Sequence, residues 1–102
     1  MVLTTCPDAK MAKNLAGALV REKLAACVQL EPVTSIYTWE EKVEEAEEIR
    51  LVIKTRQTLY PKLEAFILKH HGYQVPQVIQ IPIQNGLSTY LDWVDENTKS
   101  EN

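Results

Sequence analysis

The stretch "EEKVEEAEEIRLVIKT" (residues 40–55) decides the fold of this 102-residue chain. Its Glu, Lys, Ala and Leu residues favour a helix by intrinsic propensity. Towards its end, however, the apolar Ile49, Leu51 and Ile53 alternate with the charged Arg50 and Lys54. Such alternation is typical of a strand. On residue physics alone the two interpretations are evenly matched. As a strand, the stretch would carry acidic side chains on both faces, so neither face of its acidic half could belong to a core.

The preceding residues 25–39 are rich in β-forming residues and predict one long, interrupted strand. Pro32 has no N–H to donate, so it marks an edge, a bulge or a bend in this strand. Paired with residues 40–55, this strand would form a hairpin that projects beyond the body of the domain. Tyr37 and Trp39 would then lie on the projecting part. A two-stranded ribbon is marginal in water, and exposed aromatic residues need a partner. The pattern therefore predicts self-association.

The remaining elements follow from apolar spacing, capping residues and turn residues. They are a strand at 1–5, a helix at 9–24 that Asp8 caps, a helix from about Thr58 that Gly72 ends, a strand at 75–83, and a short last helix that Ser88 caps. This order is the α+β, ferredoxin-like βαββαβ arrangement with an extra short C-terminal helix. We expect a single domain at 1–98 and a flexible tail at 99–102.

Composition and motif content argue against several classes of function. Apolar residues make up 45% of the chain and charged residues 25%, a normal globular balance, and the net charge of −3 argues against a nucleic-acid partner. No apolar run is long enough to predict a membrane span. Two cysteines do not make a disulfide framework, so we expect a cytoplasmic protein. Nucleotide-binding motifs and a convincing nucleophile–base–acid set are absent from the sequence, so we expect no enzymatic activity.

Four stretches resemble the CutA family of divalent-cation tolerance proteins, and the resemblance covers nearly the whole chain. They are "EKLAACVQL" (22–30), "TSIYTWEEKVEEAEEIRLVIKT" (34–55), "HHGYQVPQVIQIPI" (70–83) and "YLDW" (90–93). Members of this family are ferredoxin-like homotrimers whose long hairpins pair across subunits. The resemblance therefore implies that residues 40–55 form a strand, and that sister chains supply the partner for the hairpin.

Two positions depart from the family pattern. The family usually has a glycine in the hairpin turn where this chain has Glu41. If the Glu40–Glu41 turn needs a positive φ there, the glutamate costs about 1 kcal/mol; otherwise the turn is of another type. Some members have a cysteine at the position of Thr4, whereas this chain has Cys6, about 7 Å further along the same strand face.

The adjacent His70 and His71 are the first candidate site. Imidazole suits copper, nickel and zinc, and the resemblance implies that copper or another divalent cation binds this pair, with Cys6 as a candidate third ligand. Adjacent helical residues point about 100° apart, so a regular turn would not direct both rings at one ion. In the alternative, structural interpretation, His70 faces the core edge, His71 faces solvent, and the helix dipole favours histidine at this end.

A second candidate set follows from the resemblance, which puts several residues near clefts between subunits: Tyr37, Trp39, Lys54, Tyr73 and Trp93. The architecture also resembles the trimeric PII signalling proteins, in which case Lys54 would attract an anionic ligand. Interface packing is the alternative role for this set. The acidic run at 40–48 lacks the spacing of a calcium loop and is interpreted as a solvated tip, and Cys27 as a packing residue.

Two hypotheses result. The first is a cytoplasmic, non-enzymatic, CutA-like homotrimer that acts in divalent metal tolerance and binds copper through His70, His71 and Cys6. The second is a PII-like ligand-sensing or protein-interaction module that binds a small anion in its clefts.

Overall fold

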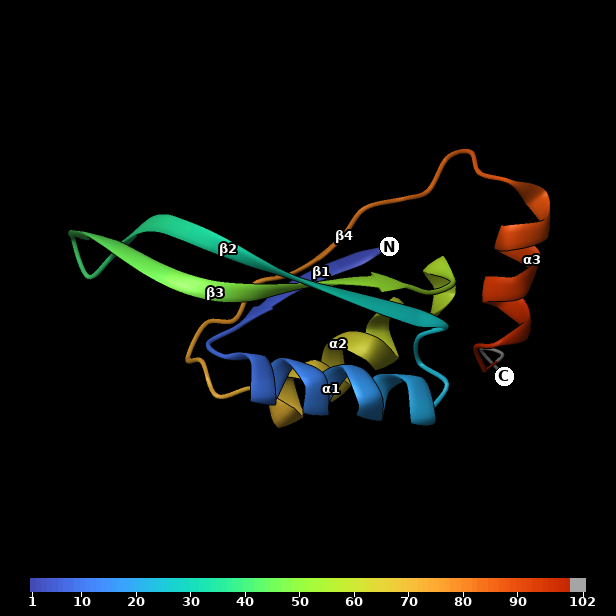
Figure 1. Cartoon of the computed structure of the whole chain (residues 1–102), viewed down its shortest axis with the longest axis horizontal. Coiled ribbons are helices and arrows are strands. Elements are labelled where there is room, and N and C mark those ends of the chain that lie inside the picture. Colours follow the sequence, from blue (N-terminus) through green and yellow to red (C-terminus); the bar gives the residue numbers. More distant parts are fainter. Residues whose placement is uncertain (100–102) are drawn as a thin grey trace.

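The computed structural model describes residues 1–99 and folds them into a four-stranded antiparallel sheet with helices on one face (Figure 1). The strand order in the sheet is β2-β3-β1-β4. The strands are β1 (Val2–Cys6), β2 (Cys27–Trp39), β3 (Lys42–Lys54) and β4 (Val78–Gln80), and the α-helices are α1 (Ala9–Arg21), α2 (Tyr60–His70) and α3 (Ser88–Glu96). Together they make the predicted βαββαβ fold with an additional C-terminal helix. Over residues 1–99, no helix combines the length and apolar character that a membrane crossing requires.

The segment that sequence left open is a strand, as the family resemblance implied. β3 pairs with β2 along its whole length, from Cys27↔Lys54 to Trp39↔Lys42. β1 pairs with β3 only from Val2↔Ile53 to Cys6↔Ile49. The part of β3 before Ile49 therefore has β2 as its sole partner within the described chain, and this two-stranded part projects from the body (Figure 1). Strand pairing at the body end outweighs the helix propensity of the acidic half.

β2 is a single unbroken strand, so the predicted interruption is wrong, whereas the edge position that Pro32 also indicated is confirmed. Pro32 pairs with Ile49 in the continuous register. It is tolerated because β2 is an edge strand of the sheet, where the missing N–H faces no neighbouring strand.

The hairpin turn has a positive φ at both central residues, 51° at Glu40 and 67° at Glu41. Because Trp39 and Lys42 pair directly, this is a two-residue loop with the signature of a type I′ turn, which favours Asn and Gly. Two glutamates in this conformation are strained. The expectation that Glu41 stands where glycine would be favoured is thus confirmed.

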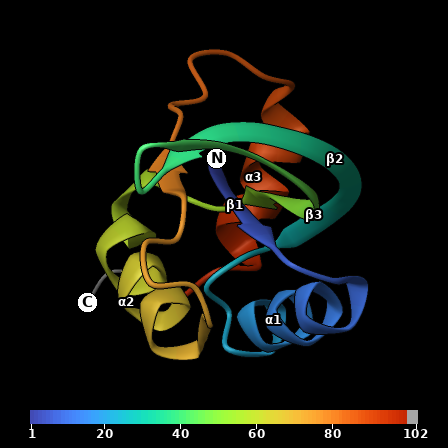
Figure 2. The same ribbon diagram turned by 90° about the vertical axis from the view of Figure 1, so that its left-hand side faces the viewer.

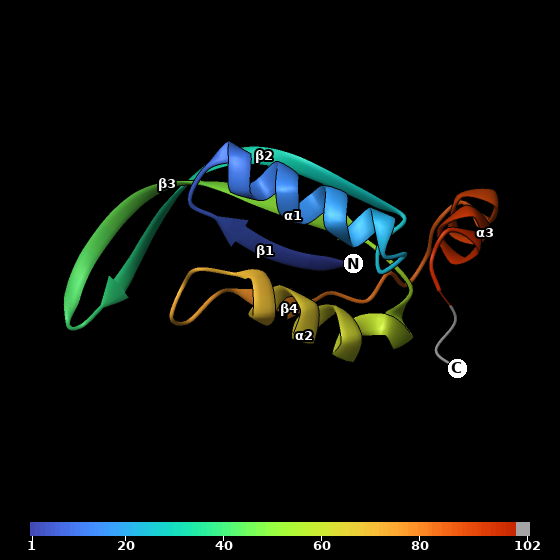
Figure 3. The same ribbon diagram turned by 90° about the horizontal axis from the view of Figure 1, so that it is seen from below.

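Helices α1 and α2 lie side by side beneath one face of the sheet (Figures 2 and 3). The carboxylate of Asp8 accepts a hydrogen bond of 2.8 Å from the Met11 N–H, which confirms it as the N-cap of α1. The core between helices and sheet consists of small and branched apolar side chains, among them Val2, Leu19, Leu51, Ile53, Leu63 and Ile67. Within residues 1–99, no helix covers the opposite face of the sheet (Figure 2).

The ends of α2 differ from their prediction. A short 3-10 turn (Gln57–Leu59) precedes the helix, so Thr58 lies inside that turn and is not the N-cap, while Pro61 occupies the first turn as expected. At the other end the chain leaves the helix through an extended His71, with φ −95° and ψ 143°. Gly72 has no positive φ and therefore does not form the left-handed cap that sequence suggested.

β4 is the edge strand beside β1, and α3 lies at the end of the molecule opposite the projecting hairpin (Figure 1). β4 has only three residues, shorter than predicted, although a backbone hydrogen bond from Ile81 to Met1 continues its pairing with the start of the chain. α3 begins at Ser88, with Leu87 as N-cap and no side-chain cap, so the predicted Ser88 cap is wrong. Val94 is the one α3 residue that is buried. The expected tail at 99–102 falls mostly outside the described residues, and Lys99 donates its backbone N–H to the Lys23 carbonyl.

Candidate functional site

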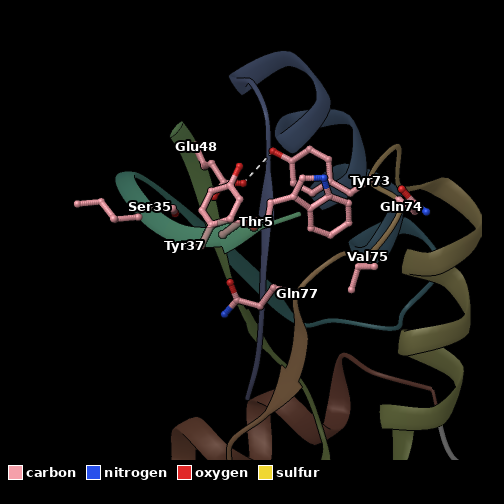
Figure 4. A pocket seen from close by; sticks show the side chains of 10 residues that line it. Thr5, Ser35, Tyr37, Glu48, Tyr73, Gln74, Val75 and Gln77 are labelled. Carbon is pink, nitrogen blue, oxygen red and sulfur yellow. Dashed lines mark hydrogen bonds between the residues drawn. The ribbon is translucent and has the colours of Figure 1, made fainter. Parts of the chain in front are cut away.

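A hollow of about 560 Å³ lies at the base of the projecting hairpin, on the sheet face that no helix covers (Figure 4). We call it the hairpin cleft. One wall comes from the hairpin, the floor from the end of β1 and the middle of β3, and the other wall from the segment that follows α2. Its lining residues are Thr5, Ser35, Ile36, Tyr37, Trp39, Glu48, Tyr73, Gln74, Val75 and Gln77.

The strand register explains why these residues meet. Val33 pairs with Glu48, and Thr5 pairs with Arg50, so odd-numbered β2 residues share a face with even-numbered β3 residues. That face is turned away from the helices. It carries Tyr37 and Trp39 from β2 and Glu48 from β3, which is why these side chains from two strands line one cavity.

Glu48 and Tyr73 join the two sides of the hairpin cleft. The Tyr73 hydroxyl donates a 2.8 Å hydrogen bond to one carboxylate oxygen, Oε2, of Glu48 (Figure 4). Glu48 is only 9% exposed. Burial, and then the hydrogen bond to Glu48, raise the pKa of Tyr73 above its ordinary value, so the phenol keeps its proton and remains a donor.

Sequence reasoning missed Glu48, which it placed in the solvated tip. Its neighbours Glu44, Glu45 and Glu47 are exposed as expected. Glu48 differs because it adjoins Ile49, the residue at which β1 begins to pair with β3. Tyr73, 25 residues later in the chain, also contacts it through a hydrogen bond. No local pattern signals such a long-range contact.

His71 anchors the Tyr73 side of the cleft. Its Nδ1 accepts a 3.1 Å hydrogen bond from the Tyr73 backbone N–H, and its Nε2 lies 2.6 Å from the Thr5 carbonyl oxygen. A carbonyl only accepts, so Nε2 carries the proton and donates it. The ring is therefore the neutral Nε2–H tautomer with both nitrogens engaged. A metal ion would have to break one of these hydrogen bonds.

His70 has the opposite environment. It is exposed, stacks on Phe66 at a ring-centroid distance of 4.2 Å, and donates from Nδ1 to the Phe66 carbonyl oxygen at 2.9 Å. Its Nε2 lone pair is left for solvent or a ligand. The structural interpretation had these roles exchanged: His71 is the inward residue and His70 the outward one.

Cys6 is fully buried in the core between β1 and the helices. Burial raises the pKa of its thiol to about 11, with a further contribution from the carboxylates of Asp8 and Glu48. The thiolate that a metal requires is thus disfavoured. Among residues 1–99, no group of three or more His, Cys, Asp or Glu side chains is arranged to hold a metal ion. The residues of one chain therefore do not fit a three-ligand copper centre.

The second predicted set separates into two groups. Tyr37, Trp39 and Tyr73 line the hairpin cleft together. Lys54 lies at the other end of β3, where its ammonium donates to the Gln29 side-chain oxygen at 2.8 Å. Trp93 lies on α3, with its ring centroid 5.8 Å from that of Tyr90. Within one chain, Lys54 therefore does not attract an anion into the cleft.

The fold and this site define a class: small ferredoxin-like proteins whose central hairpin extends far beyond the sheet and forms a cleft at its base. Within that class, residues 1–97 match the family model described as CutA1 divalent ion tolerance protein. The chain belongs to this family. The prediction that it is not an enzyme is confirmed by this membership.

Individual relatives agree in sequence and structure. The chain is 46% identical over 97 residues to Protein CutA of Mus musculus, covering 94% of this chain and 55% of the mouse protein. It is 44% identical to the divalent cation tolerance protein of Thermus thermophilus, whose solved structure matches with a TM-score of 0.93 over 96% of both chains. A solved structure of a PII-like protein CutA from Nostoc is 33% identical, with a TM-score of 0.91 over 96% of this chain and 95% of that one. The chain spans about half the length of the mammalian relatives it matches.

Proposed function

We propose that this chain acts without catalysis, as a cytoplasmic homotrimer that binds a small ligand in the hairpin cleft and thereby serves divalent-cation tolerance as a sensing module. The observation that carries the proposal is the cleft itself: about 560 Å³, lined by three aromatic rings and one buried carboxylate. Such a volume suits small-molecule sites. Both cysteines are unpaired, which supports a reducing compartment.

The support for self-association comes from apolar surface that this chain leaves uncovered. On the hairpin, Ile36 is 67% exposed and Val43 77% exposed. On α3 and the segment before it, Leu87, Tyr90 and Trp93 are exposed as well. Isolated ribbons and helices of this kind are marginal in water, so sister chains would cover both regions. Three copies is the number that the family resemblance implies.

Light scattering at micromolar concentration tests the assembly, and a mass of three chains is expected. A thermal-shift screen with small anions, cations and neutral compounds tests the ligand site. At least one compound should raise the melting temperature of the wild type and fail to do so after Tyr73→Leu, a substitution that opens the cleft wall. A stable monomer would contradict the assembly. No hit in a screen of broad chemistry would contradict the ligand site.

Direct metal binding is the second candidate function, and one observation favours it: the exposed Nε2 of His70 is available as a ligand. Copper or another divalent cation would bind weakly there, since His71 and Cys6 contribute no free donor in the form described above. Copper titration of the wild type, His70→Ala, His71→Ala and the double variant tests this. Affinity should fall with His70→Ala. Unchanged affinity in the double variant would remove the histidine pair as a metal site.

A further inference from the structure

We propose that the ligand of the hairpin cleft is a small organic ammonium ion, with a quaternary or methylated nitrogen seated between Glu48 and the aromatic rings. The inference rests on the proposed ligand role of the cleft and adds the chemical class of the ligand. It replaces the small anion that sequence analysis considered.

The charge of the cleft points to a cation. Glu48 is the only charged residue among those that line it. Its Oε2 accepts from Tyr73, whereas no hydrogen bond within residues 1–99 engages its Oε1. A carboxylate that is 9% exposed and has one unengaged oxygen attracts a positive group strongly, because water screens it poorly. An anion would be repelled by the same group.

The aromatic lining points to an organic cation. Tyr37 and Tyr73 contribute their rings to the hollow (Figure 4). Trp39 lines it as well. Aromatic faces attract ammonium groups, and quaternary nitrogens in particular, because such nitrogens have no N–H to satisfy. The Tyr73 hydroxyl donates a hydrogen bond to Glu48, which holds the Tyr73 ring next to the carboxylate.

A metal ion fits the cleft less well than an ammonium group does. Divalent cations need several oxygen, nitrogen or sulfur ligands, and the hollow offers one carboxylate. The nearest imidazole, that of His71, is occupied at both nitrogens. The uncharged polar residues of the lining, Thr5, Ser35, Gln74 and Gln77, suit instead a hydroxyl or carbonyl elsewhere on the ligand.

The experiment uses choline as the probe and 3,3-dimethyl-1-butanol, its uncharged isostere, as the comparison. Trp39 and Trp93 are the two tryptophans of the chain, so a Trp93→Phe background leaves Trp39 in the cleft as the only indole reporter. Choline should change the Trp39 fluorescence in a saturable way and release heat in calorimetry. The neutral isostere should bind at least about tenfold more weakly, since it lacks the charge.

Two variants separate the charge from other effects. Glu48→Gln keeps an oxygen that accepts from Tyr73 but loses the charge, and should weaken choline binding by about tenfold or more. Glu44→Gln is the matched control: it lies on the same face of the same strand, is exposed and does not line the cleft. Its choline affinity should equal that of the parent. If Glu48→Gln does not fold, the comparison of choline with its isostere on the parent chain still decides.

Equal binding of choline and the isostere, or no saturable signal from choline, would overturn the ammonium assignment. So would a Glu48-dependent signal from copper(II) chloride in place of choline, or dissociation of the assembly by Glu48→Gln. Light scattering on the same samples and the wider ligand screen distinguish a failure of the ammonium assignment from a failure of the proposed function. A trimer that binds another compound but not choline refutes only the ligand class, and a monomer that binds choline refutes only the assembly.

Discussion

The body of the molecule differs from its two extensions, the projecting hairpin and α3, in how completely the apolar side chains are buried. In the body, helices α1 and α2 bury the apolar face of the sheet, and the core side chains of β1 and β3 are fully enclosed. In the projecting hairpin and in α3, large apolar side chains remain exposed, with Val43 at 77% and Leu87 at 72%. The body therefore buries its apolar surface within one chain, whereas the extensions leave apolar surface that the proposed assembly would cover. The difference separates what one chain needs to fold from what it needs to assemble.

The largest expected effect lies in the body. Leu63→Ala removes a fully buried side chain of α2 and should lower the free energy of unfolding by about 2–5 kcal/mol. Chemical denaturation checks the value. The loss should be accompanied by an unchanged oligomeric state under native conditions. A loss below about 1 kcal/mol would mean that the body is not the independent core described here.

The next effect should break the hairpin without touching the body. Trp39→Ala removes an aromatic side chain that is 39% exposed in one chain. If sister chains enclose it, assembly should weaken by about 2 kcal/mol or more, as for aromatic residues at interface centres. Light scattering on a dilution series should then show dissociation at higher concentration than for the wild type. Thr38→Ala, a neighbour with the opposite side-chain direction, serves as the control, and equal behaviour of the two variants would contradict the interface role.

Substitutions in the hairpin turn should stabilise the protein by removing backbone strain. Glu40→Asn with Glu41→Gly places residues that accept a positive φ in the type I′ turn, where φ is 51° and 67°. The double variant should gain about 1–2 kcal/mol, measured by thermal unfolding at fixed protein concentration. The Glu40→Ala, Glu41→Ala pair removes the same charges but keeps the strain. If it stabilises equally, charge repulsion and not backbone strain is the cause.

The smallest expected change in stability comes from an unsatisfied hydroxyl group inside the body. Thr4 is fully buried in β1, and its hydroxyl is the one buried side-chain polar atom with no hydrogen-bond partner in the described residues. Thr4→Val keeps the shape and removes the unsatisfied group, so it should stabilise the protein by about 1 kcal/mol. Thr4→Ser, which keeps the hydroxyl and opens a small cavity, should destabilise it. A destabilised valine variant would show that the hydroxyl has a partner in the assembled protein.

The candidate site was predictable only in part. Within one chain, Tyr37, Trp39 and Tyr73 line one cleft, whereas Lys54 and Trp93 lie elsewhere. The position of all five near clefts between subunits, which the resemblance implies, stays a prediction. Glu48 was overlooked, and the inward and outward histidines were exchanged. Copper binding through His70, His71 and Cys6 stays a prediction.

The sequence by itself determined the order of the elements other than residues 40–55, and the Asp8 cap, because these depend on apolar period and local hydrogen bonding. With the family resemblance it also determined that residues 40–55 extend as a strand and that a glutamate occupies a turn position suited to glycine. The tertiary structure alone decided that β2 runs unbroken past Pro32, how α2 ends, and which acidic residue is buried against Tyr73. The physical reason is distance along the chain. Propensity, capping and alternation act over a few residues, whereas the environment of Glu48 or His71 is set by groups 25 and 66 residues away.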